Sequence, residues 1–477
     1  MSTTARDTTP ATKAFWPRRR RWLVIALAAP LLALVAFALF LFKTGAGRDL
    51  VLDQLRSALG PQVLHWEEAE GHLSGGLTLR GLRYAADGTR IELGELSLDL
   101  DALALLGGTL HLRHLESDEG RILLAMEESP PEPWPERLRL PASLPEPSLP
   151  MAVEIDALQV RRLTVLRGEE TLLAVDSLSA RAAFSEGAAT VESLELSGSP
   201  LALRLDARID TANHWATALR AQIDLSLPKA EPLALDLGLS GRLDDLALRL
   251  ATRTEPANRI ELRATGGLPE PRWSLQVEAP QLRPGWFGAA GEALALQLSG
   301  EGDLTRAALE GHLRQGDQTV ELGASELSYD QRTLRLSPLA LGLFEGRLTV
   351  EGQVDLAPAQ PNLALLARWD DLALTAGAQE ATRSTGQARL DGPLDGYALR
   401  LDGDLRRKEE QAKLTLSGRG STQALDIGSL QVQLPAGALE ASGRVVWDPQ
   451  PEAALDLRLS DFDPAWFAPH FEFRFPL

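Results

Sequence analysis

The residues whose types could support metal binding or acid–base chemistry are few and widely spaced in this chain. His111-Leu-Arg-His114 has the spacing of a metal-binding pair on a helix. On a strand, residues three apart point to opposite faces, so the two rings cannot share an ion. Asp461 and Asp463 do share a strand face, and paired carboxylates can act as general acid and base. They flank a Pro-x-Trp-Phe turn, which favours a solvent-exposed hairpin end.

No reactive nucleophile accompanies these groups. The sequence has no cysteine, no phosphate-binding glycine loop and no Gly-x-Ser-x-Gly motif. The adjacent pairs Asp244-Asp245 and Asp370-Asp371 would face opposite sides of a strand. We therefore predict that the protein is not an enzyme, and that it has no catalytic residues, no metal site and no cofactor.

An apolar segment near the N-terminus predicts the position of the chain relative to a membrane. Trp22 to Phe42 are uncharged, and about 20 apolar residues in a helix cover the hydrocarbon core of a bilayer. The four residues before the segment are Arg18, Arg19, Arg20 and Arg21. By the positive-inside rule they keep the N-terminus in the cytoplasm. Bulky residues at the end of the segment favour a retained anchor over a cleaved signal peptide.

Alternation of apolar and polar residues dominates the sequence from residue 63 onward. Side chains of a strand point alternately to its two faces, so each run has one apolar and one polar face. Short turns such as Asp87-Gly88 separate the runs, as in antiparallel meanders. The predicted fold is all-β after one N-terminal transmembrane helix. We expect an elongated, twisted antiparallel β-sheet curled into a groove, of the β-taco or solenoid-like kind.

The apolar face of such a sheet must be covered by a second sheet, by curling of the sheet, or by a ligand. A curled sheet forms an apolar trough that can shelter acyl chains. A dry sandwich of two packed walls explains the alternation equally well. The net charge of −18 argues against nucleic acid as a partner. The candidate lipid-groove residues are Leu201, Leu203, Leu205, Ile209, Leu233, Leu235, Leu237, Leu239, Leu348, Val350 and Val354.

Composition suggests where the chain divides. Eight prolines between residues 129 and 150 indicate an excursion from the sheet or a stiff linker. A short helix after the apolar segment lies against the bilayer, caps the first strand, or is a simple helical connector. The expected segments are a cytoplasmic tail (1–21), a transmembrane helix (22–42), a juxtamembrane helix (46–60), a membrane-proximal β module (61–128), a Pro-rich linker (129–150) and an elongated β-groove (151–477).

The C-terminal run Phe471-Glu-Phe473-Arg-Phe475 also alternates, and no capping element follows it. An open strand edge is an aggregation template that natural proteins usually cover. We therefore expect the sequence to be the N-terminal portion of a longer gene product, truncated in its β-groove.

The run Gly71-His-Leu-Ser-Gly-Gly-Leu-Thr-Leu-Arg-Gly-Leu-Arg-Tyr84, soon after an apolar segment and a short helix, resembles the opening of the TamB family. Later Leu-x-Leu runs and Gly-x-Leu-x-x-x-Gly repeats fit the same family. The more distant AsmA-like proteins have sequence patterns of the same kind. The resemblance covers most of residues 18–477. Members are usually longer and end in a C-terminal domain that we do not find here.

The resemblance implies an inner-membrane, single-pass subunit of the translocation and assembly module of Gram-negative bacteria, with its bulk in the periplasm. It implies a β-groove that conducts phospholipids toward the outer membrane and supports outer-membrane protein and autotransporter assembly. A TamA-like outer-membrane barrel protein would be its partner. The alternative is a structural or chaperone-like β-array that templates outer-membrane protein strands without carrying lipid. The sequence does not distinguish these two.

Overall fold

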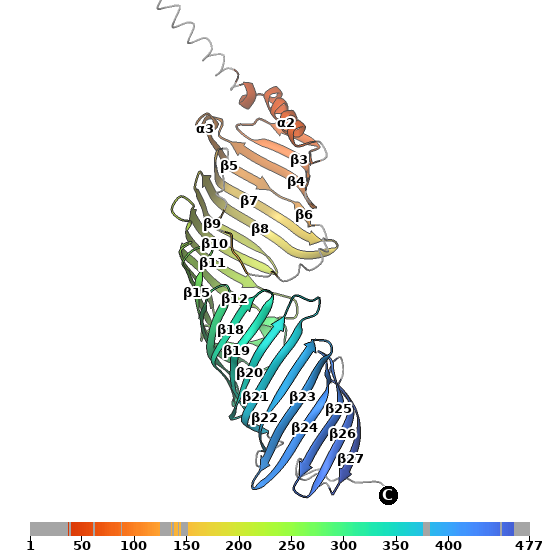
Figure 1. Cartoon of the computed structure of the whole chain (residues 1–477). Coiled ribbons are helices and arrows are strands. Elements are labelled where there is room, and N and C mark those ends of the chain that lie inside the picture. Colours follow the sequence, from red (N-terminus) through yellow and green to blue (C-terminus); the bar gives the residue numbers. More distant parts are fainter. Residues whose placement is uncertain are drawn as a thin grey trace, which may run out of the picture. The chain divides into compact units, whose positions relative to one another are not determined.

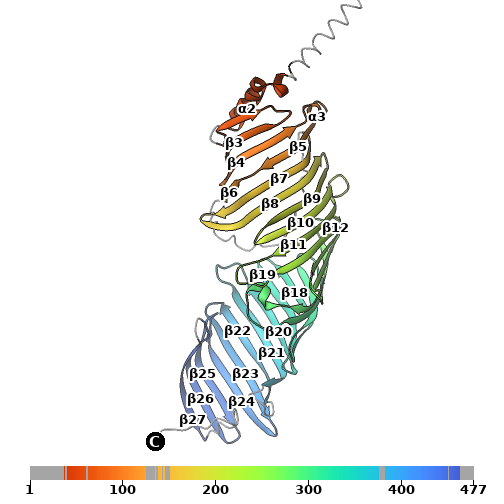
Figure 2. The same ribbon diagram turned by 180° about the vertical axis from the view of Figure 1, so that it is seen from behind.

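The computed structural model describes residues 37, 40–60, 63–86, 88–124, 135, 138–141, 143–144, 151–374, 382–448 and 451–461 (Figures 1 and 2). In these residues it contains 27 strands, the helices α2 and α3 and one short 3-10 helix, and residues 40–43 before α2 are also helical. The chain forms two compact units. The first comprises residues 1–125 and 150–183, and the second comprises residues 126–149 and 184–477.

The first unit begins with helix α2 (Gly45–Leu59), whose N-terminus is capped by the hydroxyl of Thr44, which accepts a hydrogen bond from the Gly47 amide. A second helix, α3 (Ala102–Leu106), begins after Asp101, whose carboxylate accepts from the amides of the first turn. The strands of this unit are β1 (Leu64–His65), β2 (Glu68–Gly71), β3 (Leu77–Ala86), β4 (Thr89–Leu100), β5 (Thr109–Ser117), β6 (Gly120–Leu124), β7 (Ala152–Arg167) and β8 (Glu170–Ser185).

Helix α2 packs on the first strands of this unit. Leu52 of the helix is buried against Trp66, Leu73, Leu77 and Leu79. The guanidinium of Arg56 also stacks on the Trp66 ring, 3.9 Å from its centroid, a favourable cation–π arrangement. The helix therefore covers the start of the sheet with one apolar side.

The second unit is a single meander. From β9 to β27, strands that follow one another along the chain pair antiparallel. Both views show that the strands of this sheet twist progressively (Figures 1 and 2).

The bounds of its strands are β9 (Ala188–Ser199), β10 (Leu201–Asp210), β11 (Ala216–Leu225), β12 (Leu233–Arg242), β13 (Asp245–Thr252), β14 (Arg259–Thr265), β15 (Arg272–Leu282), β16 (Leu294–Gly302), β17 (Arg306–Gln315), β18 (Gln318–Asp330), β19 (Thr333–Leu343), β20 (Gly346–Asp355), β21 (Asn362–Leu374), β22 (Thr382–Pro393), β23 (Tyr397–Arg407), β24 (Glu410–Gly420), β25 (Ala424–Leu434), β26 (Gly437–Val446) and β27 (Glu452–Ser460). The 3-10 helix η1 (Pro284–Phe287) lies between β15 and β16.

The prediction of a nearly all-β, twisted antiparallel architecture is confirmed, with two exceptions among the strand pairs. Strand β7 runs parallel to both β5 and β6. Parallel neighbours cannot be joined by a tight hairpin and need a longer crossover. The Pro-rich stretch lies between β6 and β7, and proline suits such a connection because it cannot donate to a strand ladder.

The first unit includes strands on both sides of the Pro-rich stretch in the sequence. Strand β7 belongs to the first unit, because it pairs with β5 and β6, although it follows the Pro-rich stretch. The described residues between 126 and 149 belong to the second unit. In that unit the Tyr329 hydroxyl donates a hydrogen bond to the carbonyl of Pro135.

No helix of the described residues is both long enough and apolar enough to cross a membrane. The predicted span, residues 22–42, lies almost entirely outside the described residues, as do the four arginines before it. The alternating run at residues 471–475 also lies outside them.

Candidate functional site

The apolar face of the second unit is built from leucines that meet across neighbouring strands. Leu203 of β10 lies opposite Ile223 of β11, and Ile223 lies opposite Leu235 of β12. Leu201 is linked in the same way to Leu233 through β11. Because side chains on one face recur every second residue, these pairs place the alternating leucines of successive strands side by side.

One row of cross-strand partners continues without interruption from β10 to β27. Each member is the direct partner of the next, so all of them point to the same face of the sheet. The row is Leu205, Ala221, Leu237, Leu250, Ile260, Val277, Leu298, Gly311, Leu322, Leu341, Leu348, Trp369, Gly386, Gly403, Leu414, Val432, Leu439 and Leu459.

This row places all eleven candidate groove residues on one face. The first eight lie on β10 and β12, the last three lie on β20, and the row joins Leu205 to Leu348. Each of the eleven side chains is half-buried, neither enclosed in a core nor fully exposed. The sequence reasoning missed the row members on the strands between and beyond them. Their runs alternate too, but alternation does not reveal which face of one strand adjoins which face of another.

The apolar face is not equally open along its length. Leu405, Ala412, Val432 and Leu434 form a buried cluster on strands β23 to β25, and neighbouring leucines pack against it. Tyr329, on the same face of β18, is buried and bonded to the Pro135 carbonyl, so a described residue of the Pro-rich stretch also lies on this face. The face is therefore in contact with Pro135 at this point.

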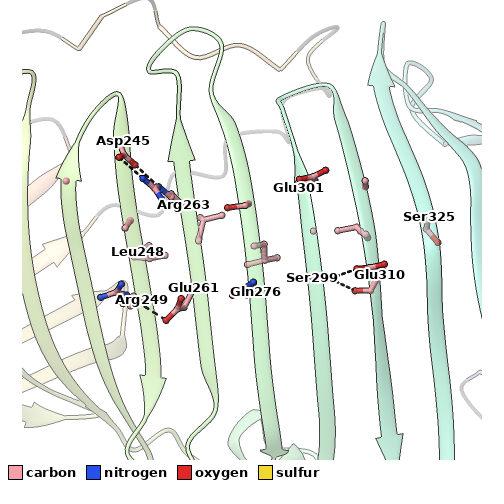
Figure 3. A pocket seen from close by; sticks show the side chains of 18 of the residues that line it. Asp245, Leu248, Arg249, Glu261, Arg263, Gln276, Ser299, Glu301, Glu310 and Ser325 are labelled. Atoms are coloured by element: carbon pink, nitrogen blue, oxygen red, sulfur yellow. Dashed lines mark hydrogen bonds and ion pairs between the residues drawn. The ribbon is translucent and has the colours of Figure 1, made fainter.

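The opposite, polar face carries an open hollow of about 900 Å³ over strands β12 to β18. Figure 3 shows two of its oppositely charged pairs, Asp245 with Arg263 and Arg249 with Glu261. Arg263 makes two hydrogen bonds of 2.8 Å to the carboxylate of Asp245. Ser299 Oγ lies 3.2 Å from Oε1 of Glu310 and donates to it. Both arginines of this hollow, Arg249 and Arg263, are thus paired with carboxylates on the surface of the sheet.

The carboxylate of Asp245 is stabilised in its charged form by the neighbouring Arg263. The hydrogen bonds and the positive charge of Arg263 lower the pKa of Asp245 below its ordinary value. A general acid working near neutral pH needs a raised pKa instead. The hollow therefore has the chemistry of a water-facing ion-paired surface.

We expect Asp245→Asn to lower the thermal unfolding midpoint by the same small amount from pH 7 to pH 5. Because the folded pKa is depressed, the pair stabilises the protein above the ordinary carboxyl pKa of about 3.9. That contribution is lost as the pH falls below this value and through the lowered folded pKa. Thermal melts of both proteins across pH test this, and a difference that changes between pH 5 and 7 would contradict it.

The histidines of the His-x-x-His sequence have separate partners. Nε2 of His111 lies 2.9 Å from Asp156, and Nε2 of His114 lies 3.0 Å from Glu116. Among the described residues, no group of three or more His, Cys, Asp or Glu side chains is placed to hold a metal ion. Asp461 is exposed at the end of β27, and Asp463 lies outside the described residues.

An antiparallel meander with one continuous apolar face and one ion-paired polar face defines an extended β-scaffold protein. The chain belongs to the TamB family: the family model described as "TamB, N-terminal domain" matches residues 31–139, 136–360 and 344–475. Comparison with curated proteins and with solved structures gives no match. Members of this family are structural or transport components and not a known class of enzyme, and the family is associated with the translocation and assembly module.

Proposed function

We propose that this protein conducts phospholipids along the apolar face of its second unit, as the inner-membrane subunit of the translocation and assembly module. The observation that carries this proposal is the uninterrupted row from Leu205 to Leu459, whose members lie on one face of one sheet. Acyl chains laid on this face would be carried toward the outer membrane. There they would support the assembly of outer-membrane proteins and autotransporters.

The half-buried state of the leucines supports an open trough. In a two-sheet sandwich the inward side chains of both sheets interdigitate into a closed core. Here the eleven candidate residues keep part of their surface free. Covering apolar surface is worth about 0.8 kcal/mol per buried methylene, so an acyl chain on this face gains several kcal/mol relative to water. Headgroups would stay in water at the strand ends.

The proposed location follows from the sequence. Residues 22–42 would anchor the chain in the inner membrane, with Arg18 to Arg21 in the cytoplasm and the two β units in the periplasm. A TamA-like outer-membrane barrel protein is the expected partner, on the strength of family membership.

One observation favours the alternative in which the sheet templates strands of outer-membrane proteins. Leu455, Leu457 and Leu459 of β27 are 41%, 57% and 49% exposed. In the described part of the chain, β27 pairs only with β26. Such an edge can accept an added strand by β-augmentation.

Site-specific photo-cross-linking in the full chain in cells tests the proposal. A photoreactive residue at Leu235 lies on the apolar face, and one at Gly238 in the same strand lies on the polar face. We expect phospholipid adducts at position 235 and none at position 238. Polypeptide adducts at 235 without lipid would favour the templating function, and equal lipid labelling at both positions would overturn the trough.

A further inference from the structure

Three large aromatic side chains on the apolar face lie directly opposite a glycine. Trp273 faces Gly302, Trp369 faces Gly386 and Tyr397 faces Gly420. A β-carbon added to any of these glycines would come within 2.9 Å of a ring atom of its aromatic partner. The rings therefore lie over the bare backbone of the next strand. Pairing of this kind is known to stabilise sheets.

Trp369 extends further across the sheet than direct pairing requires. Its Cζ2 atom lies 2.6 Å from the β-carbon position of Gly386 on β22 and 3.3 Å from that of Gly403 on β23. Neighbouring strands are about 4.8 Å apart, so a ring standing upright on β21 could not reach β23. The indole Nε1 donates a 2.8 Å hydrogen bond to Oγ of Ser384, which is buried. The ring is thus fixed nearly parallel to the sheet.

The Trp369 ring lies in the continuous row, next to the buried cluster of strands β23 to β25. Trp369, Gly386 and Gly403 are consecutive members of the continuous row. Of the next members, Leu414 packs against the buried cluster and Val432 belongs to it. An upright indole at this point would project from the apolar face beside that cluster.

We infer that Trp369 is held flat so that it does not obstruct the apolar face beside the buried cluster, with Ser384 and the two glycines as positioning residues. This inference rests on the proposed function, because an open route matters only if cargo moves along the face. In this arrangement Trp369, the largest side chain of the row, lies against the sheet at the base of the proposed trough.

Gly403→Val tests the inference. The backbone of Gly403 has an ordinary conformation, and its β-carbon position contacts only the Trp369 ring (3.3 Å) and the carbonyl oxygen of Thr385 (3.5 Å). Valine also favours strands, so the main effect is to push the ring away from the sheet. We expect lipid adducts at a probe on Leu457 of β27 to fall about tenfold, while those at a probe on Leu235 of β12 persist.

The double variant Gly403→Val with Trp369→Leu should restore labelling at Leu457, because the displaced ring is gone. Gly238→Val is the matched control, since a β-carbon there meets nothing within 4 Å on the polar face. Unchanged labelling at Leu457 in Gly403→Val, or loss that Trp369→Leu does not relieve, would show that the ring serves only stability. Absence of lipid adducts at Leu235 in the unmodified chain would instead refute the proposed function.

Discussion

Leu235→Asp should abolish lipid labelling on the apolar face while leaving the strand content of the protein unchanged. Leu235 lies between Ile223 and Thr252 on neighbouring strands, and its side chain is half-buried. A carboxylate at this half-buried position can stay hydrated, so folding tolerates it. An acyl chain laid over it would strip that water from an unpaired charge, which costs several kcal/mol. We therefore expect at least about a tenfold loss of lipid adducts at neighbouring positions.

Gly238→Asp provides the matched control for this charge. It introduces the same carboxylate into the same strand, but on the polar face between Arg220 and Arg249. Lipid labelling from Leu203 should remain at the level of the unmodified protein. Circular dichroism of both variants checks the strand content. Full lipid labelling in Leu235→Asp would remove the main support for transport along this face.

Of the substitutions considered, Leu77→Ala should lower the free energy of unfolding most, and the loss should fall on the first unit. Leu77 is 2% exposed and packs in the cluster that joins α2 to the sheet through Leu52 and Trp66. Removing a fully buried leucine side chain typically costs 2–5 kcal/mol, from lost burial and from the cavity that remains. Hydrogen exchange of α2 amides should accelerate strongly, because the helix depends on this packing.

The control is Leu103→Ala on α3 in the same unit, where the leucine side chain is 78% exposed. The same chemical change at an exposed position should leave exchange and unfolding close to those of the original protein. If Leu77→Ala leaves α2 as protected as before, the helix is held by something other than this cluster.

Several features could be predicted from sequence because they depend on residues close together in the chain. The alternation in runs such as Leu233 to Leu239 fixes the two faces of each strand, since side-chain direction repeats every second residue. The eleven candidate residues therefore fall on apolar faces as expected. That these residues share one face of the sheet could not be predicted from the sequence, because it depends on the register between strands. Irregularities such as the one between Leu336 and Leu339 shift that register without any clear sequence signal.

The amino-acid sequence by itself determined the all-β character, the amphipathic strands, the family and the absence of recognisable catalytic motifs. Only the tertiary structure revealed the parallel placement of β7, the contact of Pro135 with Tyr329, and the flat ring of Trp369 over Gly386 and Gly403. The physical reason is that alternation is a property of neighbouring residues. Those contacts join residues far apart in the chain, and only the paired strands bring them together.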